Sequence, residues 1–259
     1  LEGRKAGSHG GKLAAQYILT EISRLDLQPL GKDGFQFFDV VTAVHAGDNN
    51  SLKIAEFSGS PAVDFTPLAF TDNARLSASL AFVGYGFDFD EDSLSWHDYN
   101  AVDVAGRWVL VLRGSPEPDE PHSIYANHSS LRKKVLKAKD HGAAGVVFVS
   151  GENFDADDEL KELHYDQSQS DAGIPVIHIK RSVAERLLER TRQTISELEN
   201  QAANPESFKS FLIDNILTVE TEVLKNEVVT QNVVAQLTGN DPILQEEYII
   251  IGAHYDHLG

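Results

Sequence analysis

The chain has 259 residues, no cysteine and no methionine, and its 22 basic and 40 acidic side chains give a formal net charge of −18. This length allows one large or two modest domains, while the acidic charge argues against nucleic acid or an anionic membrane as a partner, since both need a basic surface. No apolar run approaches the ~20 residues needed to cross a bilayer. Because there are no thiolates, any zinc must be bound by histidines and carboxylates.

A helix is expected first. Ser8 has a side chain suited to an N-cap, and the apolar residues after it recur at spacings of three and four. This apolar face comprises Leu13, Ala14, Tyr17, Ile18, Ile22 and Leu25. Pro29 and Gly31 should end the helix. Strands are predicted at 35–44 and 52–57, and Gly47-Asp48-Asn49-Asn50 between them indicates a β-hairpin.

The middle of the chain alternates between short apolar strands and helical segments. Strands are predicted at 78–85, 107–113, 146–149 and 174–179, and helices at 130–141 and 183–203. This alternation is typical of a small α/β layer attached to a sheet. In the helix at 130–141 we expect the four lysines to form a solvated face. These are Lys133, Lys134, Lys137 and Lys139.

Two chemically distinctive residues follow the last predicted strand. Strands are expected at 217–224, 227–237 and 248–253, and His254 and Asp256 come directly after the third. Side chains two apart on a strand point the same way, so both can face one site. A neutral imidazole binds zinc, and a carboxylate behind it orients the ring. The alternative is a hydrogen-bonded histidine at a strand end, with Asp256 in a turn.

Several segments together carry a resemblance to a known family. The chain resembles the co-catalytic zinc aminopeptidases, which are relatives of aminopeptidase Y, aminopeptidase S and glutamate carboxypeptidase. The similar segments are 2–8, 232–239 and 248–259 at the ends, and 84–86, 98–100, 102–112, 137–148 and 174–176 in the middle. The middle segments resemble the protease-associated (PA) domain that many of these enzymes carry as an insertion.

The resemblance implies an α/β fold with two domains. A three-layer αβα zinc-peptidase domain, present in part and with a mixed sheet, would take residues 1–64 and return with 206–259. An α+β PA domain would occupy 65–205 between the two parts. The return segment would end at the first metal ligand.

The resemblance also implies a function and roles for two residues. His254 would bind one of two zinc ions, and Asp256 would support it as the carboxylate of the catalytic site. The protein would then be a metallo-aminopeptidase that removes amino-terminal residues from peptides with a metal-activated water. No other ligand or general base can be placed, so the 259 residues alone are expected to be inactive. The alternative is a non-catalytic receptor or interaction protein of the same architecture, acting through the PA domain.

Partners and location follow from the same reasoning. We expect peptide substrates, no nucleic acid, and protein contacts through the PA domain. An acidic, cysteine-free chain without an initiator methionine fits an exported and trimmed product, so a periplasmic or secreted location is expected. Four acidic residues in one loop have the oxygen ligands of a calcium site but lack the spacing of a calcium loop, so a solvated loop is favoured. They are Asp155, Asp157, Asp158 and Glu159.

Overall fold

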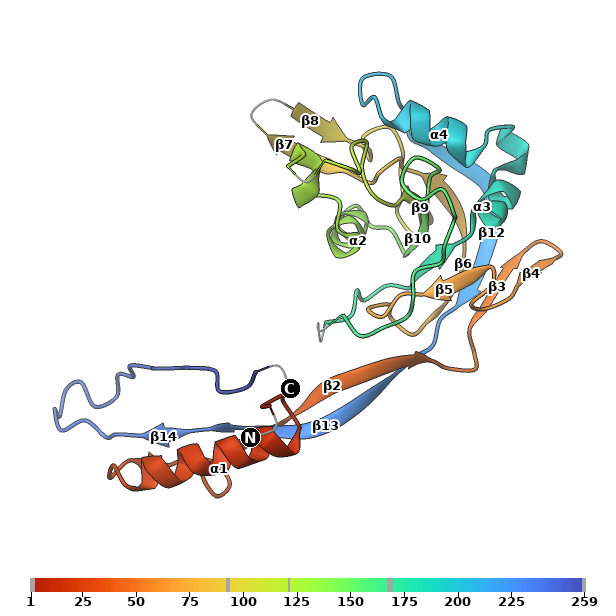
Figure 1. Ribbon diagram of the computed structural model, residues 1–259. Helices are drawn as coiled ribbons and strands as arrows, with labels where there is room; N and C mark the ends of the chain where they lie inside the picture. Colours follow the sequence, from red (N-terminus) through yellow and green to blue (C-terminus); the bar gives the residue numbers. More distant parts are fainter. Residues whose placement is uncertain (1–2, 92–93, 121, 167–169, 258–259) are drawn as a thin grey trace. The chain divides into compact units, whose positions relative to one another are not determined.

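The computed structural model describes residues 3–91, 94–120, 122–166 and 170–257 (Figure 1). Glu2, Leu258 and Gly259, which belong to segments of the family resemblance, lie outside the described residues. The chain divides into two compact units. The flanking unit comprises Leu1–Ala43 and Lys225–Gly259, and the central unit comprises Val44–Leu224.

The flanking unit contains the predicted first helix, α1 (His9–Ser23). The Ser8 hydroxyl accepts a hydrogen bond from the Gly11 amide at 3.1 Å, as expected of an N-cap. Strand β1 (Gln28–Pro29) pairs with β14 (Ala235–Gln236). Strands β2 (Phe35–Ala46) and β13 (Val223–Val233) form a second two-stranded sheet, the long ribbon in Figure 1.

The central unit is built on an eight-stranded mixed sheet in the order β4-β3-β12-β6-β9-β10-β11-β5. Strands β6, β9, β10 and β11 are parallel, and the others join antiparallel. The bounds are β3 Ser51–Ile54, β4 Phe57–Gly59, β5 Phe65–Pro67, β6 Arg75–Phe82, β9 Trp108–Leu112, β10 Gly145–Val149, β11 Val176–Ile179 and β12 Phe211–Glu220.

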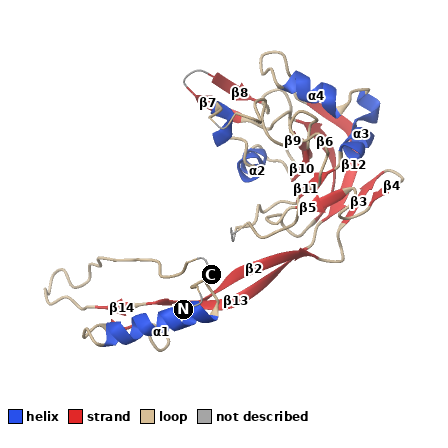
Figure 2. Ribbon diagram, in the orientation of Figure 1, coloured by secondary structure: helices blue, strands red, loops and turns tan. Residues whose placement is uncertain are grey.

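The sheet is strongly curled. Its two edge strands, β4 and β5, are joined only by residues 60–64. A flat sheet of this size would separate its edges by ~34 Å, whereas the connection reaches roughly 20 Å when fully extended. The edges must therefore approach each other, and Figure 2 shows the strands bending round.

Helices cover both faces of the sheet. Trp108, Leu110 and Leu112 of β9 belong to one core with α3 (Arg181–Leu188) and α4 (Ile195–Ala202). Val109 and Val111 belong to a second core with α2 (Leu131–Asp140). Alternate residues of a strand face opposite sides, and β9 is apolar throughout because both sides are covered. The predicted α/β class with a mixed sheet is confirmed.

Four shorter elements complete the central unit. They are β7 (Asp88–Glu91), β8 (Leu94–His97) and the 3-10 turns η1 (Ile124–Asn127) and η2 (Glu189–Thr191). The turn η2 divides the single helix that was predicted at 183–203, because Arg192 adopts a left-handed φ of 58°. No helix in the described part of the chain is long and apolar enough to span a membrane.

The hairpin prediction at 47–50 is wrong. Strand β2 pairs with β13, and β3 pairs with β12 and β4. The turn is closed by a residue far along the chain, because the Glu222 carboxylate accepts hydrogen bonds from the Asn49 amide and side chain. A Cβ at Gly47 would lie 2.1 Å from a carboxylate oxygen of Glu222, so a larger residue there would displace this side chain.

The strand predicted at 248–253 does not form. This segment is irregular, and Ile249, Ile250 and Ile251 are 94, 91 and 93 % exposed. A strand needs neighbours to complete its hydrogen-bond ladder, and among the described residues none pairs with it. Hydrophobicity alone therefore did not decide its conformation. The three-layer arrangement of the peptidase domain stays a prediction, since the flanking unit shows one helix and two-stranded sheets in its described residues.

Candidate functional site

The structure brings His254 and Asp256 together, although in a turn and not on a strand. His254 Nδ1 lies 3.0 Å from the backbone oxygen of Asp256 and 3.8 Å from its carboxylate. A carbonyl oxygen can only accept, so Nδ1 must donate and the proton of a neutral ring resides there. This leaves the lone pair of Nε2 available. The His254 side chain is 82 % exposed, so that nitrogen is accessible to a metal ion.

Contacts within the flanking unit hold this turn. The Tyr255 hydroxyl donates to the backbone oxygen of Gln231 on β13. Arg4 Nε donates to the backbone oxygen of Tyr255 at 2.7 Å, and the His257 amide donates to that of Arg4 at 3.1 Å. Partial burial raises the pKa of Tyr255 above its ordinary value, so the phenol remains a donor. The neighbours of His254 and Asp256 are thus anchored, while the two side chains remain exposed.

A groove of about 400 Å³ lies beside this turn in the flanking unit. It is lined by Arg4, Leu13, Ala14, Tyr17, Ile18 and Tyr255. Two residues of the predicted apolar face of α1 are exposed here, Leu13 at 44 % and Tyr17 at 67 %.

The described residues do not by themselves make a catalytic zinc site. Such a site takes three protein ligands and keeps a fourth position open. No group of three histidine or acidic side chains that could hold a metal ion occurs among the described residues. His254 and Asp256 supply one imidazole and one carboxylate. Their chemistry suits zinc, but the donor set is incomplete.

The acidic loop at 155–159 is not arranged as a cation site. Arg113 Nη1 lies 3.7 Å from the Asp155 carboxylate, and Arg181 Nη1 lies 3.8 Å from that of Asp158. Arg181 also donates to the backbone oxygens of Asp155 and Ala156. Guanidinium groups therefore take up the oxygens that a calcium ion would use. The expectation of a solvated loop is wrong for Asp155 and Asp158, whose side chains are only 20 and 17 % exposed.

Sequence reasoning also misplaced Lys134, which is 1 % exposed and not solvated. Its ammonium donates to the backbone oxygens of Leu112 at 2.8 Å and Gly114 at 2.7 Å. It lies 4.7 and 5.2 Å from the ring centroids of Phe87 and Tyr85. A signal for this burial was present, because position 134 falls on the inward helical face with Leu131, Val135 and Ala138.

Lys134 is accompanied by a buried carboxylate, Asp98. The Asp98 oxygens accept from the Phe87 amide at 2.9 Å and from Trp96 Nε1 at 2.8 Å. Burial raises the pKa of Asp98 to about 7, and these hydrogen bonds oppose the shift. Burial likewise lowers the pKa of Lys134 to about 7, against the attraction of Asp98. Lys134 and Asp98 are thus hydrogen-bonded to neighbouring groups of the fold and attract each other electrostatically, which is a structural role.

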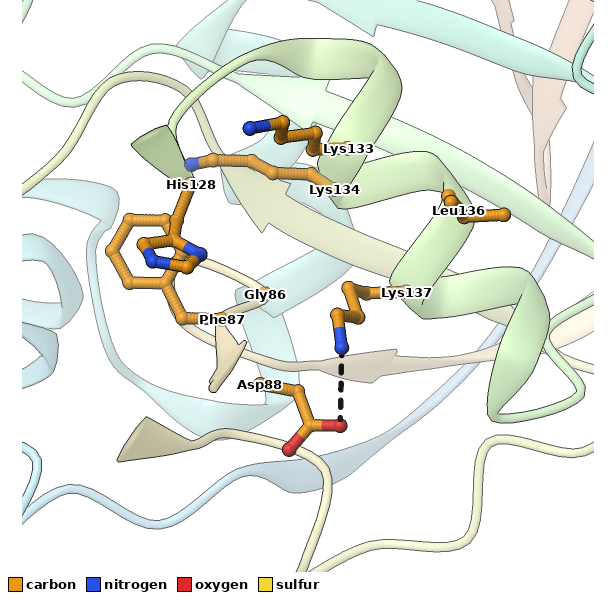
Figure 3. A pocket seen from close by; sticks show the side chains of 8 residues that line it. All are labelled: Gly86, Phe87, Asp88, His128, Lys133, Lys134, Leu136 and Lys137. Atoms are coloured by element: carbon orange, nitrogen blue, oxygen red, sulfur yellow. Dashed lines mark ion pairs between the residues drawn. The ribbon is translucent and has the colours of Figure 1, made fainter. Parts of the chain in front are cut away.

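A small cleft of about 80 Å³ opens between α2 and the start of β7 (Figure 3). Its walls are formed by Gly86, Phe87, Asp88, His128, Lys133, Lys134, Leu136 and Lys137. The Lys137 ammonium points toward the Asp88 carboxylate at 4.0 Å. Neither His254 nor Asp256 lines this cleft, so it is a separate feature of the central unit.

The central unit has a recognisable family. Residues 67–187, which include α2, the parallel strands β6, β9, β10 and β11 and the cleft, match the PA domain family. The central unit contains a PA domain. This part of the resemblance drawn from the sequence is confirmed, and the matched segment falls within the predicted 65–205. The predicted domain boundaries themselves stay a prediction.

Three solved structures that are similar to 88–93 % of this chain are peptidases by name. An aminopeptidase from Aneurinibacillus sp. strain AM-1 is 17 % identical, with a TM-score of 0.47 over 93 % of this chain and 46 % of that one. A zinc aminopeptidase from Bacillus subtilis is 18 % identical, with a TM-score of 0.42 over 88 % of this chain and 41 % of that one. A peptidase precursor from Shewanella amazonensis is 16 % identical, with a TM-score of 0.37 over 90 and 47 %.

The chain thus spans less than half the length of each of these proteins. A comparison with curated proteins finds no significant match.

Proposed function

We propose that this chain is part of a zinc-dependent aminopeptidase with an inserted PA domain. The observation that carries the proposal is the His254–Asp256 turn. Its hydrogen bond at Nδ1 leaves Nε2 as an exposed metal ligand, on a segment that follows the PA domain. This tautomer lets a histidine bind zinc through Nε2.

In this proposal His254 holds one of two zinc ions, and the turn with Asp256 fixes the orientation of its ring. The zinc ions would polarise the peptide carbonyl and lower the pKa of a bound water. The remaining ligands and the general base would come from sequence outside these 259 residues. The groove of about 400 Å³ is lined by Tyr255, the residue that follows His254 in the sequence.

The experiment is an assay of the full-length protein on aminoacyl-nitroanilides, with and without a chelator. We expect hydrolysis that the chelator abolishes and zinc restores. His254→Ala should remove nearly all activity and lower the zinc content of the purified protein. His257→Ala is the matched control. Among the described residues His257 contacts Arg4 through its backbone amide, so loss of the imidazole should leave this hydrogen bond in place. Hydrolysis that persists in the chelator would sink the proposal.

A second candidate function rests on the PA domain, which is the part of the chain that a family match supports. The protein would then be a non-catalytic receptor or interaction protein, and the PA domain would bind other proteins. Zinc-loaded full-length protein that hydrolyses no aminoacyl or dipeptide substrate would favour this candidate over the enzyme.

We also propose that the protein works outside the cytoplasm. The support is indirect, namely the acidic, cysteine-free composition and the peptide substrates expected of such an enzyme. Fractionation of cells that express the full gene tests it. Recovery of the protein only in the cytoplasmic fraction, from a gene without an export signal, would contradict it.

A further inference from the structure

Strand β7 of the PA domain is attached to its surroundings by histidine–carboxylate pairs. Three of its four residues are acidic, namely Asp88, Asp90 and Glu91. Three histidines from three different elements contact these carboxylates. They are His97 on β8, His128 at the end of η1 and His141 at the end of α2.

His97 has a carboxylate at each ring nitrogen. Its Nδ1 lies 2.8 Å from Asp88 and its Nε2 lies 3.3 Å from Asp90. A neutral imidazole has one N–H, so one nitrogen would present its lone pair to a carboxylate. Only the doubly protonated ring donates to both. The geometry therefore favours the charged form of His97.

His141 and His128 link the same strand to the helical side of the unit. His141 Nε2 lies 3.0 Å from the second oxygen of Asp88, and its ring stacks on Tyr99 at 4.4 Å. His128 Nε2 lies 2.8 Å from Glu91, and its ring stacks on Phe89 at 3.8 Å. Each ring is thus fixed by stacking and directed at one carboxylate oxygen.

The other charged groups facing this cluster come from α2. The Lys137 ammonium is 4.0 Å from Asp88, and Lys133 and Lys134 line the same cleft (Figure 3). Lys133 donates to the backbone oxygen of Asn127, and Lys134 to those of Leu112 and Gly114. Of these lysines Lys137 alone is paired with a β7 carboxylate among the described residues. Two buried groups beside this strand also titrate near neutral pH, because burial lowers the pKa of Lys134 to about 7 and raises that of Asp98, which accepts from the Phe87 amide, to about 7. The histidine variants described below separate their effect from that of His97.

We propose that β7 and β8 form a proton-controlled latch, which is held while His97 is protonated between Asp88 and Asp90 and loosens when His97 loses its proton. The contacts of Asp88 with His141 and of Glu91 with His128 would loosen with it. Loosening would uncover the Phe89 ring and open the cleft at Phe87. The latch would let the PA domain present different surfaces in mildly acidic and mildly alkaline surroundings.

The pKa shifts agree in sign with this device. The hydrogen bond from Asp88 raises the pKa of His97 above its ordinary 6.5, although burial opposes it. The resulting stabilisation is complete below pH 6.5 and is lost as the pH rises through the raised value. Burial by itself would raise the pKa of Asp88, but the hydrogen bonds from His97 and His141 outweigh this effect, so the pKa lies below 3.8. That contribution is lost only in strong acid, so the latch should be tightest in mild acid.

Amide hydrogen exchange of the chain at pH 5.5 and pH 8.5, corrected for the intrinsic rate, tests the latch. The protection of the β7 and β8 amides should fall about tenfold at the higher pH, because several partly exposed ion pairs each contribute a small part of the stabilisation. Amides of β9 and β10 serve as the internal reference, because burial lowers the pKa of His178, the histidine on the neighbouring strand β11, to about 3, well below this pH range. Equal protection of β7 and β8 at both pH values would overturn the proposal.

Variants separate the latch from a general effect of pH. In the double variant His97→Gln, His141→Gln the protection should be low at both pH values, while β9 and β10 remain protected. Asp88→Asn should behave in the same way, since it removes the shared acceptor. His45→Gln, at an exposed histidine on β2, should keep the wild-type pH dependence. A pH dependence that survives in both latch variants contradicts the proposal. If these variants fail to fold, the wild-type comparison decides it alone.

Discussion

At the scale of single residues, the adjacent lysines Lys133 and Lys134 should differ in their contribution to stability, because Lys134 is buried and Lys133 is exposed. Lys134→Met should lower the free energy of unfolding by about 3 kcal/mol, because it leaves two buried carbonyl oxygens without their donor and removes a cation that attracts the buried Asp98 carboxylate. Lys133→Met should change it by less than about 0.5 kcal/mol. Urea unfolding followed by tryptophan fluorescence measures both, since Trp96 and Trp108 lie in the cores. Equal effects would mean that Lys134 is not an interior cation.

Asp256 allows a second residue-scale test, which depends on the proposed function. Asp256→Asn keeps the backbone oxygen that accepts from His254 Nδ1, but it removes the charge 3.8 Å from that nitrogen. We expect full-length protein to fold and to lose about 10–100-fold in zinc affinity or turnover, as is typical when a group behind a ligand is changed. Competition with a chromophoric chelator gives the affinity directly. An unchanged affinity and turnover would restrict the role of Asp256 to its backbone.

At the scale of elements, local signals predicted helices well and strand partners poorly. Ser8 caps α1 as the sequence predicted, and Ser130, the first residue of the helix predicted at 130–141, caps α2. Both signals are local, because a cap is made within four residues of its helix. The turn at 47–50 has hairpin composition, yet its hydrogen bonds come from Glu222. Strand pairing is a property of segments distant in sequence, which local composition does not report.

The helix α4 offers a test of such a local signal. Thr194 and Glu197 form a capping box, in which each side chain accepts from the backbone amide of the other residue. Thr194→Ala should lower the free energy of unfolding by about 1 kcal/mol, and Thr194→Ser should restore most of it. Equilibrium denaturation of the three proteins provides the comparison. A serine variant as unstable as the alanine variant would show that the methyl group matters more than the cap.

At the scale of the whole molecule, the central unit should fold without the flanking unit. Both hydrophobic cores lie entirely within residues 44–224. We expect a fragment of these residues to unfold cooperatively and to retain the exchange protection of β9 and β10. A fragment of residues 65–205, the boundaries predicted from the sequence, would lack β3, β4 and β12. Comparing the two fragments by circular dichroism and thermal denaturation decides which boundaries describe the folding unit.

The affinity for zinc should likewise differ between these 259 residues and the full-length protein. One imidazole and one carboxylate fall short of three protein ligands, so we expect the 259 residues to bind zinc weakly and without catalytic activity. Full-length protein should bind two zinc ions tightly. Isothermal titration of each at the same pH measures this difference. Tight, stoichiometric binding by the 259 residues alone would show that they hold a complete site.

The sequence by itself determined the α/β class, the capped helices, the PA domain and the candidate pair His254–Asp256. These follow from hydrophobic periodicity, short-range hydrogen bonds and segments that resemble a family in the same order, all of which can be recognised from the order of residues in the sequence. Only the tertiary structure decided the partners of β2 and β3, the burial of Lys134, and the irregular course of 248–253. It also decided that three histidines meet the carboxylates of β7. Each of these depends on contacts between residues that are distant in sequence, and the energy of such contacts is not a property of either segment alone.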